Sequence, residues 1–492
     1  MFGLGEDSVM AGAGVPQGGI TSYDDWNAFA KAVAASGYET DHASLTGTQA
    51  LRVESLEGQL RKVIESEPTF KLFRALKRQP VTSAVHEWTV QSDIGGQPEG
   101  MFNSELGDIG SNVGQYERKI VFIKYLMTQA AISHVASVQK GIVNLKSTEN
   151  MNALLRLSRS ANWAMYHGDS GVAPMQFDGT ITQLNTFRAG LHVSDLGGSS
   201  DVQEIIDAVY GSYANVLGLG NFGKLTHIHM DPQLQNALDR ELDPAYRVNL
   251  DSNPAGLQYG APVTGIRTSY GSVMTEQDIW IHNSDNTMPN YARYDRVPQD
   301  APGAPTLATA VSGTADDTEF TATKGGGGSF FYRVAAVDER GVESIPSAAI
   351  SIVAVPEGQT VELTITPNAD HDQTGYAIYR STALEGGASE PELRDFRLVT
   401  RIAANANRSA TTVWEDENRE IPGQSHAFLF NRVPESIAWA QLLPATQFPL
   451  YPTAKAIIPW AVLLYGALQL AIPNHHYVIK GFVPATSKWK PW

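Results

Sequence analysis

The chain has 492 residues, of which 42% are hydrophobic, so it can form about two to four domains with packed cores and is not disordered throughout. Its net charge of −16 argues against a protein whose main task is to grip nucleic acid through phosphates, because that task requires a basic face. Cysteine is absent, which excludes disulfides, thiolate nucleophiles, zinc fingers and iron–sulfur clusters.

The first 80 residues predict an arm followed by helices. Residues 1–20 are small and Gly-rich and lack the basic and apolar regions of a secretory signal, so we expect a mobile arm. Ser22 with the acidic residues after it predicts a helix N-cap, and a second helix is expected over residues 48–65. Lys71–Arg78 predicts a basic amphipathic helix closed by Pro80. This helix could touch nucleic acid, but a solvated face or an intersubunit ion-pair site is at least as well supported.

Residues 81–137 change to an extended pattern. Val81–Val90 and Arg118–Met127 are rich in strand-forming residues and predict two strands. The polar, Gly-rich stretch 91–115 between them completes a long two-stranded excursion with little apolar content. Such an excursion cannot bury itself, so we expect it to need a partner surface.

Helices and strands are mixed from residue 148 to residue 241, which indicates an α+β protein. Apolar residues recur at helical spacing over 148–166 and 201–217, and Asp201 with Glu204 predicts a capping box for the second helix. Leu225–Met230 predicts a strand. Asp231 as N-cap and Pro232 at the first helical position predict the helix that follows, over 233–241.

Residues 301–425 predict a β-sandwich of about 100 residues. Short alternating runs are separated by turn residues, and they lie at 330–337, 349–355, 361–365, 375–380 and 397–403. Pro- and Gly-rich stretches bound the segment, so we expect its deletion to leave the remaining fold intact. It carries 18 acidic and 9 basic residues, more than half of the excess charge of the chain, as suits a solvated outer module.

The apolar stretch 456–473 has to be considered as a candidate membrane-spanning helix. A spanning helix needs about 20 apolar residues, and this stretch is broken by Pro459 and Gly466. We expect two buried strands instead, Val462–Tyr465 and Leu468–Ile472, joined by a turn at Gly466.

The sequence offers one candidate metal set. His227 and His229 would share a face of their strand, and Asp231 could be a third ligand. We favour the alternative, in which Asp231 caps the next helix. His475 and His476 have no carboxylate nearby in the sequence, so structural histidines are favoured there too.

Three further motifs have structural interpretations. Gly168–Gly171 resembles the surroundings of a nucleophilic serine but follows a helix and lacks the G-x-S-x-G spacing, so a helix C-cap turn is predicted. Gly325–Gly328 lacks the lysine and helix of a phosphate loop and predicts a hairpin or a loop tip. Asn407–Ser409 fits the glycosylation pattern, but the match carries no functional prediction because the sequence shows no secretion signal. No catalytic, cofactor-binding or metal-binding residues are therefore assigned, and no cofactor is expected.

Several passages together resemble the major capsid proteins of tailed phages with the Hong Kong 97-like fold. These passages are Ala164–Ser170, Gln176–Ile181, Lys224–Asn236, Pro459–Leu468 and Ala471–Pro473. The resemblance covers most of residues 20–300 and 426–492. It implies an N-terminal arm and helices (1–78), an extended loop (79–130), a peripheral domain with a spine helix (131–180), an axial domain (181–300), an immunoglobulin- or fibronectin-like insertion (301–425) and axial and peripheral return strands (426–492).

The resemblance also implies a function. It predicts a non-enzymatic major capsid protein that assembles in the host cytoplasm into hexamers and pentamers of an icosahedral virion shell. The implied partners are a portal, a decoration protein and packaged DNA bound on the inner face without sequence specificity, with no membrane. A separate scaffolding protein is expected because no long charged coiled coil precedes residue 80. No set of residues in this sequence identifies the Lys–Asn isopeptide bond that links subunits in some relatives.

Two alternatives remain open at this point. One is a bacterial carbohydrate-binding, carbohydrate-processing or adhesive protein that carries a fibronectin-like module. The other is a different virion or tail structural protein. Physical reasoning favours a shell protein, because long polar loops recover their ordering entropy only when neighbouring subunits bury them.

Overall fold

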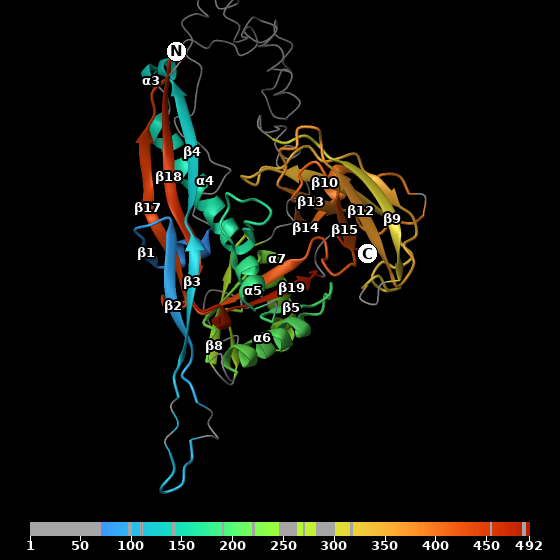
Figure 1. Ribbon diagram of the computed structural model, residues 1–492. Helices are drawn as coiled ribbons and strands as arrows, with labels where there is room; N and C mark the ends of the chain where they lie inside the picture. The colour runs from blue at the N-terminus through green and yellow to red at the C-terminus, as the bar shows by residue number, and fades with distance from the viewer. Residues whose placement is uncertain are drawn as a thin grey trace, which may run out of the picture. The chain divides into compact units, whose positions relative to one another are not determined.

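The computed structural model describes residues 70–96, 101–108, 110, 112–139, 144–188, 191–218, 222–245, 263–268, 271–281, 301–314, 318–386, 388–452, 455–484 and 489–492. These residues all belong to one compact unit, Lys62–Trp492. Helices and strands are mixed along it (Figure 1), so the predicted α+β class is confirmed. The predicted arm, the cap at Ser22 and the helix over 48–65 lie outside the described residues.

A long helix packs on a sheet of long strands (Figure 1). The helix is α4 (Leu145–His167), and it confirms and extends the helix predicted over 148–166. The strands are β1 (Arg78–Pro80), β17 (Ile437–Pro449), β18 (Ile457–Leu470) and β4 (Lys124–Ser133), in that order across the sheet. Leu157, Ala161 and Met165 on α4 share one core with Trp439 and Trp460 of the sheet.

The prediction of two strands around a turn at Gly466 is wrong. Strand β18 continues through Gly466 and pairs with β4 on one side and β17 on the other. The glycine accommodates a neighbouring side chain instead, because an added Cβ at Gly466 would lie 2.4 Å from the Trp439 ring. A glycine required for packing and a glycine required for a turn look alike in a sequence.

The predicted basic helix Lys71–Arg78 is shorter than expected. Helix α2 covers Lys71–Ala75, and the chain then extends into β1. The amide of Trp439 donates to the carbonyl of Lys77, and β1 pairs in parallel with β17. Tertiary pairing therefore overrides the helical pattern at the end of this segment.

A two-stranded hairpin projects beyond the long-stranded sheet (Figure 1). It consists of β2 (Val85–Asp93) and β3 (Gln115–Phe122), which pair in antiparallel register. The single strand predicted over Arg118–Met127 is wrong, because the chain breaks at Ile123 between β3 and β4. Ile123 is buried, and its amide donates to the carbonyl of Ala84 at 2.8 Å. The residues on both sides of the break favour strands, so the sequence carries no turn signal there.

A further sheet has six strands, which come from distant parts of the chain. Its strands, in spatial order, are β5 (Val193–Asp195), β19 (Tyr477–Phe482), β16 (Ser425–Phe430), β6 (His227–Met230), β8 (Gly271–Gln277) and β7 (Gly265–Thr268). The helices of this part are α5 (Thr180–Arg188), α6 (Val202–Leu217) and α7 (Pro232–Ala245). Asp201 caps α6 by accepting from the amide of Gln203 at 2.9 Å, so the predicted N-cap is confirmed. The amide of Asp201 donates to the hydroxyl of Ser199 at 3.1 Å, so the reciprocal bond of the predicted capping box with Glu204 is not formed.

Residues 306–416 form two further sheets. One has the order β11 (Ile350–Ile352), β10 (Phe330–Val337), β13 (Gly375–Arg380) and β14 (Arg397–Ala403). The other has the order β15 (Thr412–Asp416), β12 (Gln359–Thr366) and β9 (Thr306–Thr314). Buried residues from both, such as Tyr332, Ile378 and Leu363, form one core. The five runs predicted as strands in this segment correspond to β10–β14.

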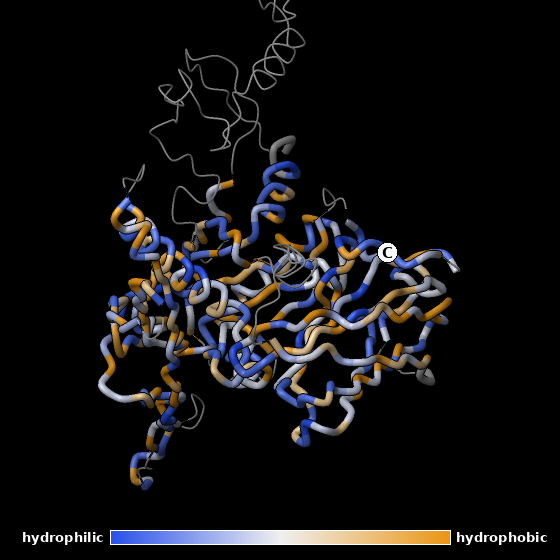
Figure 2. The backbone as a smooth tube through the Cα atoms, turned by 90° about the horizontal axis from the view of Figure 1, so that it is seen from above, coloured by the Kyte–Doolittle hydropathy of each residue, from blue (hydrophilic) through white to orange (hydrophobic). Residues whose placement is uncertain are grey.

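Short helices complete the described elements: α3 (His134–Val138) and 3₁₀ turns over Leu393–Asp395 and Pro473–His475. No helix in the described ranges combines the length and the apolar character needed to cross a membrane. Figure 2 shows hydrophobic and hydrophilic residues mixed along helices and strands alike.

Candidate functional site

The predicted histidine pair shares one face of β6 and meets a carboxylate on the neighbouring strand. The Nε2 atoms of His227 and His229 each lie 3.9 Å from an oxygen of Glu276 on β8. Arg432 also engages Glu276, because its guanidinium donates to Oε1 at 2.6 Å. The carboxylate that faces the pair is thus already bound to a cation.

Asp231 does not join the histidines. Its Oδ1 accepts from the amide of Leu234 at 2.6 Å, and its Oδ2 accepts from the hydroxyl of Ser425 at 2.7 Å. The interpretation of Asp231 as the cap of α7 is confirmed, and the set of His227, His229 and Asp231 is not assembled. Among the residues that the structure describes, no three His, Asp or Glu side chains gather closely enough to hold a metal ion.

A buried carboxylate beside this histidine pair joins several elements. Oδ2 of Asp278 accepts from the side chains of Asn162 at 2.8 Å and Tyr166 at 3.1 Å, and from the amide of Lys71 at 3.1 Å. Its Oδ1 accepts from the amide of Trp280 at 3.0 Å. Since Asn162 and Tyr166 lie on α4 and Lys71 begins α2, this carboxylate fixes the start of the described chain to the long helix.

Two further contacts extend the cluster. Oδ1 of Asn162 accepts from the amide of Phe73 at 2.9 Å. The hydroxyl of Tyr166 lies 3.3 Å from Nδ1 of His229. The cluster therefore links α2, α4, β6 and the end of β8 through buried hydrogen bonds.

Burial shifts the titration of each member. It raises the pKa of the Asp278 carboxyl above its ordinary value, against the opposing effect of the hydrogen bonds that the carboxylate accepts. Burial, with the nearby Asp278 charge, raises the pKa of Tyr166 well above its ordinary value. Burial, with the nearby Arg432 charge, lowers the pKa of His229 well below its ordinary value. A neutral phenol and a neutral imidazole around a fully hydrogen-bonded carboxylate suit a structural junction.

The turn predicted after the long helix is present at Gly168–Gly171. The amide of Gly168 donates to the carbonyl of Ala164 at 2.9 Å, which ends α4. The carbonyl of Gly168 accepts from the amide of Gly179 at 2.8 Å, and an added Cβ at Gly168 would lie 2.3 Å from the carbonyl oxygen of Phe177. Close backbone packing therefore requires glycine here, and the C-cap interpretation is confirmed.

The remaining motifs make the following contacts. His476 is buried, and its Nε2 lies 3.1 Å from the hydroxyl of Ser436, an arrangement that suits the structural role favoured for it. Gly325–Gly328 forms a loop before β10, as predicted, with Gly325 and Gly327 at positive φ. The motif at Asn407 lies in the turn between β14 and β15, where the Ser409 hydroxyl donates to its Oδ1 at 2.7 Å.

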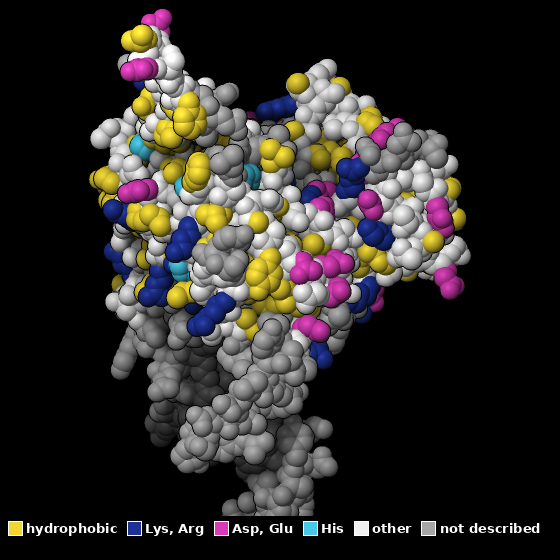
Figure 3. Space-filling view, turned by 90° about the horizontal axis from the view of Figure 1, so that it is seen from below, with side chains coloured by type: hydrophobic (Ala, Val, Ile, Leu, Met, Phe, Trp, Pro, Cys, Tyr) yellow, Lys and Arg dark blue, Asp and Glu magenta, His cyan; other side chains and the backbone are white. Residues whose placement is uncertain are grey.

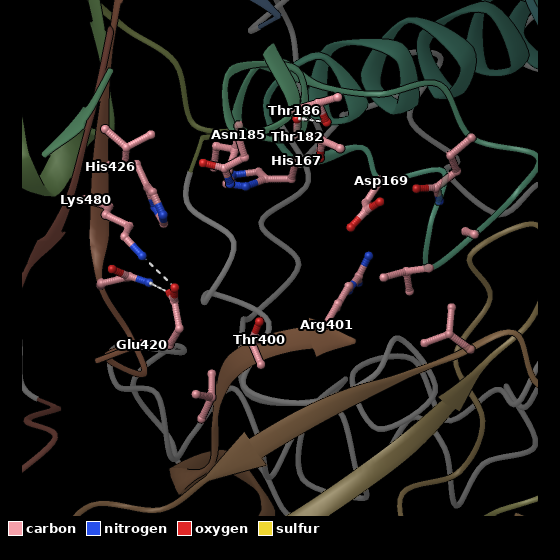
Figure 4. Close-up of a pocket in the computed structure, with 18 residues that line it drawn as sticks. His167, Asp169, Thr182, Asn185, Thr186, Thr400, Arg401, Glu420, His426 and Lys480 are labelled. Carbon is pink, nitrogen blue, oxygen red and sulfur yellow. Dashed lines mark hydrogen bonds and ion pairs between the residues drawn. The ribbon is translucent and has the colours of Figure 1, made fainter. Parts of the chain in front are cut away.

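A cavity of about 530 Å³ lies between the end of α4, helix α5 and strand β14 (Figure 4). Figure 4 shows Arg401 pointing from β14 toward Asp169, while Lys480 points toward Glu420 on the opposite side. Lys480 Nζ lies 2.5 Å from Glu420, and Arg401 lies 2.5 Å from Glu343. Both Lys480 and Arg401 are thus held in ion pairs at this cavity.

The tip of the β2–β3 hairpin exposes large apolar side chains. Ile94 is 84% exposed, Phe102 is 89% exposed and Leu106 is 97% exposed. The sequence interpretation missed them, since it described residues 91–115 as poor in apolar residues. Their exposure makes the hairpin tip a candidate for contact with another protein surface.

A second exposed apolar surface crosses the long-stranded sheet, and we call it the sheet face. Tyr125 and Met127 on β4 pair in register with Tyr465 and Leu463 on β18, so these four side chains lie on the same side of the sheet. Tyr125 and Met127 are exposed, and the rings of Tyr125 and Tyr465 meet edge to face at 4.8 Å. Figure 3 shows that hydrophobic side chains are scattered in several clusters over one face of the molecule.

Sequence reasoning also missed the Asp278 cluster. One local signal was available, because Asn162 lies next to Ala161 on the buried stripe of α4, where a polar residue needs a partner. The sequence did not reveal which residue would supply that partner, since Asp278 is 116 positions away.

Comparison with known proteins finds one similar curated protein over nearly the full length. The chain is 25% identical over 461 residues to a protein named "Putative major capsid protein" of Enterococcus phage phiEF24C, which covers 90% of this chain and 92% of that protein. No protein-family model matches.

Solved structures with similar chains include the capsid of a native GTA particle, with 10% identity over 90% of this chain and 100% of that chain, and a TM-score of 0.45. They also include a structure from Mycobacterium phage Ogopogo, with 9% identity over 89% of this chain and 99% of that chain, and a TM-score of 0.43.

Proposed function

We propose that this protein is a major capsid protein that self-assembles into the icosahedral head shell of a tailed phage and encloses its DNA. The observation that carries the proposal is the sequence similarity to a phage major capsid protein over 90% of the chain. The name of that relative, "Putative major capsid protein", agrees with the function that the resemblance of passages such as Ala164–Ser170 implies. The function is structural, and the protein is not an enzyme.

The architecture supports a Hong Kong 97-like fold. Helix α4 on the long-stranded sheet corresponds to the spine helix of the peripheral domain (131–180), and the β2–β3 hairpin corresponds to the extended loop (79–130). The six-stranded sheet with α5, α6 and α7 corresponds to the axial domain (181–300) and its return strands (426–492).

Residues 301–425 correspond to an immunoglobulin- or fibronectin-like insertion. Two antiparallel sheets with a common core have the layered arrangement of such modules. The acidic excess of this segment suits an outward, solvated position.

The hairpin tip and the sheet face supply complementary subunit contacts. Each subunit presents one apolar projection, around Phe102 and Leu106, and one apolar surface, around Tyr125 and Met127. A contact between two different patches of identical chains is heterologous, and it closes into rings when the rotation per subunit allows. Hexamers and pentamers are such rings.

The further partners follow from this role. A separate scaffolding protein, a portal and a decoration protein act with the shell, which forms in the host cytoplasm. Packaged DNA lies on the inner face without sequence-specific contacts. The exposed Lys71, Arg74 and Lys77 on or beside α2 are candidates for weak, salt-sensitive phosphate contacts.

Electron microscopy of the purified full-length chain tests the proposal. We expect closed particles of uniform size, seen by negative staining and by light scattering, either from the chain alone or with the scaffolding protein of the same phage. A chain that stays monomeric at every concentration, with scaffolding protein present, would contradict it. Tail-like tubes instead of closed shells would identify a different virion protein.

A further inference from the structure

The segment Trp489–Trp492 lies against the 301–425 module, although it follows that module far along the chain. The indole Nε1 of Trp489 donates to the carbonyl of Asp395 at 2.8 Å. The guanidinium of Arg397 lies 5.2 Å from the centre of the same ring. The carbonyl of Pro491 accepts from the amide of Ala383 at 3.0 Å. Three separate positions of the module thus bind this segment.

The same segment contacts the rest of the protein. The ring of Trp492 packs on Gly198 in the loop after β5, where an added Cβ would lie 2.3 Å from it. The Cβ of Trp492 also lies 3.6 Å from the position that a Cβ on Gly325 of the module would occupy. Lys490 Nζ donates to the carbonyl of Pro484, just after β19, at 2.8 Å. Trp492 therefore connects the module to the six-stranded sheet region.

A second contact between the same two parts involves Val172. This residue of the turn after α4 is 4% exposed and packs among module residues, including Val337 and Tyr379. Its carbonyl accepts from the hydroxyl of Thr374 at 2.8 Å. Val172 and the segment Trp489–Trp492 thus contact the module from two different elements of the protein.

An ion pair adds a third contact. Lys480 on β19 lies 2.5 Å from Glu420 of the module and 3.4 Å from Asp195 at the end of β5. Burial acts to lower the pKa of Lys480, but the two carboxylates outweigh it, so the pKa lies above its ordinary value. The lysine is charged where it bridges the module and the sheet.

We propose that Trp489–Trp492 is a latch that fixes the 301–425 module in one orientation on the rest of the chain. Its two chain connections alone would not fix an angle between the parts. The contacts of Val172 and Lys480 each rest on one residue of the remaining protein, whereas Trp489–Trp492 joins the module to that protein through several residues at once. Two tryptophan rings carry large apolar area at a low cost in side-chain entropy, which suits them to close the joint. Every subunit then presents the same face of its module in the same direction. This inference stands independently of the proposed function.

Distance measurement between two spin labels tests the latch. The chain has no cysteine, so Thr366→Cys on the module and Gln203→Cys on α6, both exposed positions, can be labelled without background. Pulsed electron paramagnetic resonance is recorded on the full-length chain diluted with unlabelled chain. We expect one narrow distance distribution, which broadens when Trp489→Ala and Trp492→Ala are combined. The matched control is Tyr451→Ala, a 90% exposed aromatic residue, which should leave the distribution narrow.

The outcomes separate clearly. A distribution that stays narrow in the double variant overturns the latch, and so does one that is already broad in the unaltered chain. If the double variant does not fold, Trp492→Ala alone removes the contact with Gly198 and should still broaden the distribution. Hydrogen exchange gives a second readout: the amide of Ala383 should exchange about tenfold faster or more in either variant. Unchanged exchange at Ala383 would also overturn the proposal.

Discussion

The ring of Trp439 on β17 lies against the backbone of Gly466 on β18, so closely that an added Cβ at Gly466 would lie 2.4 Å from it. Trp439 is fully buried and packs edge to face with Phe73 and Phe177 at 5.3 and 5.4 Å. The indole consequently has no room to move away from a substituted residue 466. The packing in the middle of the long-stranded sheet thus requires glycine, a residue without a side chain, at position 466.

Gly466→Ala should destabilise the protein by about 1–3 kcal/mol, because it overpacks a core that cannot relax. Urea unfolding of the full-length chain measures the change. Gly211→Ala is the matched control. Gly211 is an exposed position inside α6 with no heavy atom near its added Cβ outside its own helix backbone, so this change should stabilise the protein by about 0.5–1 kcal/mol. Equal effects of the two substitutions would contradict the packing role of Gly466.

Replacing the apolar tip of the hairpin should prevent assembly without unfolding the subunit. Phe102→Asp combined with Leu106→Asp places charges at positions that are 89% and 97% exposed, so the monomer should lose little stability. A contact that buries these positions against a neighbouring subunit would be lost, because burying an unpaired charge is costly. Particle formation is followed by light scattering, and the subunit fold is followed by circular dichroism. Glu105→Gln on the same tip is the control and should assemble normally. Normal particles from the double variant would remove the tip from the subunit contact.

The buried histidine His476 should make the protein less stable in acid. Burial lowers the pKa of His476 to about 3, against an ordinary value of 6.5. Below pH 6.5 the unfolded chain binds a proton that the folded chain does not, so this contribution to stability is lost as the pH falls from 6.5 toward 3. The loss is about 1.4 kcal/mol per pH unit at most.

Urea unfolding of the unaltered chain and of His476→Gln between pH 4 and pH 7 measures this effect. We expect the difference in unfolding free energy between the two chains to shrink as the pH falls, because only the unaltered chain carries the buried imidazole. His134→Gln, at an exposed position that begins α3, is the control for a general effect of removing a histidine. A constant difference across this pH range would show that His476 does not titrate abnormally.

Removing one partner of the buried ion pair in the 301–425 module should strongly destabilise the protein. Arg380 donates to Asp416 at 2.6 Å and to Asn418 at 2.7 Å, and both members of the pair are essentially inaccessible to solvent. Asp416→Leu leaves an unpaired guanidinium between Phe330 and Phe320 and should destabilise the protein by about 3–5 kcal/mol.

The double variant Asp416→Leu with Arg380→Met is the comparison for this pair. It removes both charges, so it should recover much of the lost stability, as measured by thermal unfolding of the full-length chain. A double variant no more stable than Asp416→Leu alone would mean that the hydrogen bonds to Tyr332 and Asn418 outweigh the unpaired charge.

Local patterns in the amino-acid sequence were sufficient for the elements whose signal is complete within one stretch of chain. Helix α4, the caps at Asp201 and Asp231, and the strands β10–β14 all appear where periodicity or a capping residue predicts them. Each signal reports which side of an element faces the core, and that property is set over neighbouring residues.

Contacts between distant stretches needed the folded chain. Gly466 resembles a turn until Trp439 is placed beside it, and the strand predicted over Arg118–Met127 breaks only because Ile123 is buried against the backbone of Ala84. The Asp278 cluster joins residues more than a hundred positions apart, and the latch at Trp489–Trp492 joins the module to a loop at Gly198. A residue type indicates that a side chain needs a partner, but only the packing of the whole chain selects which partner it meets, because that choice depends on all the other contacts formed at once.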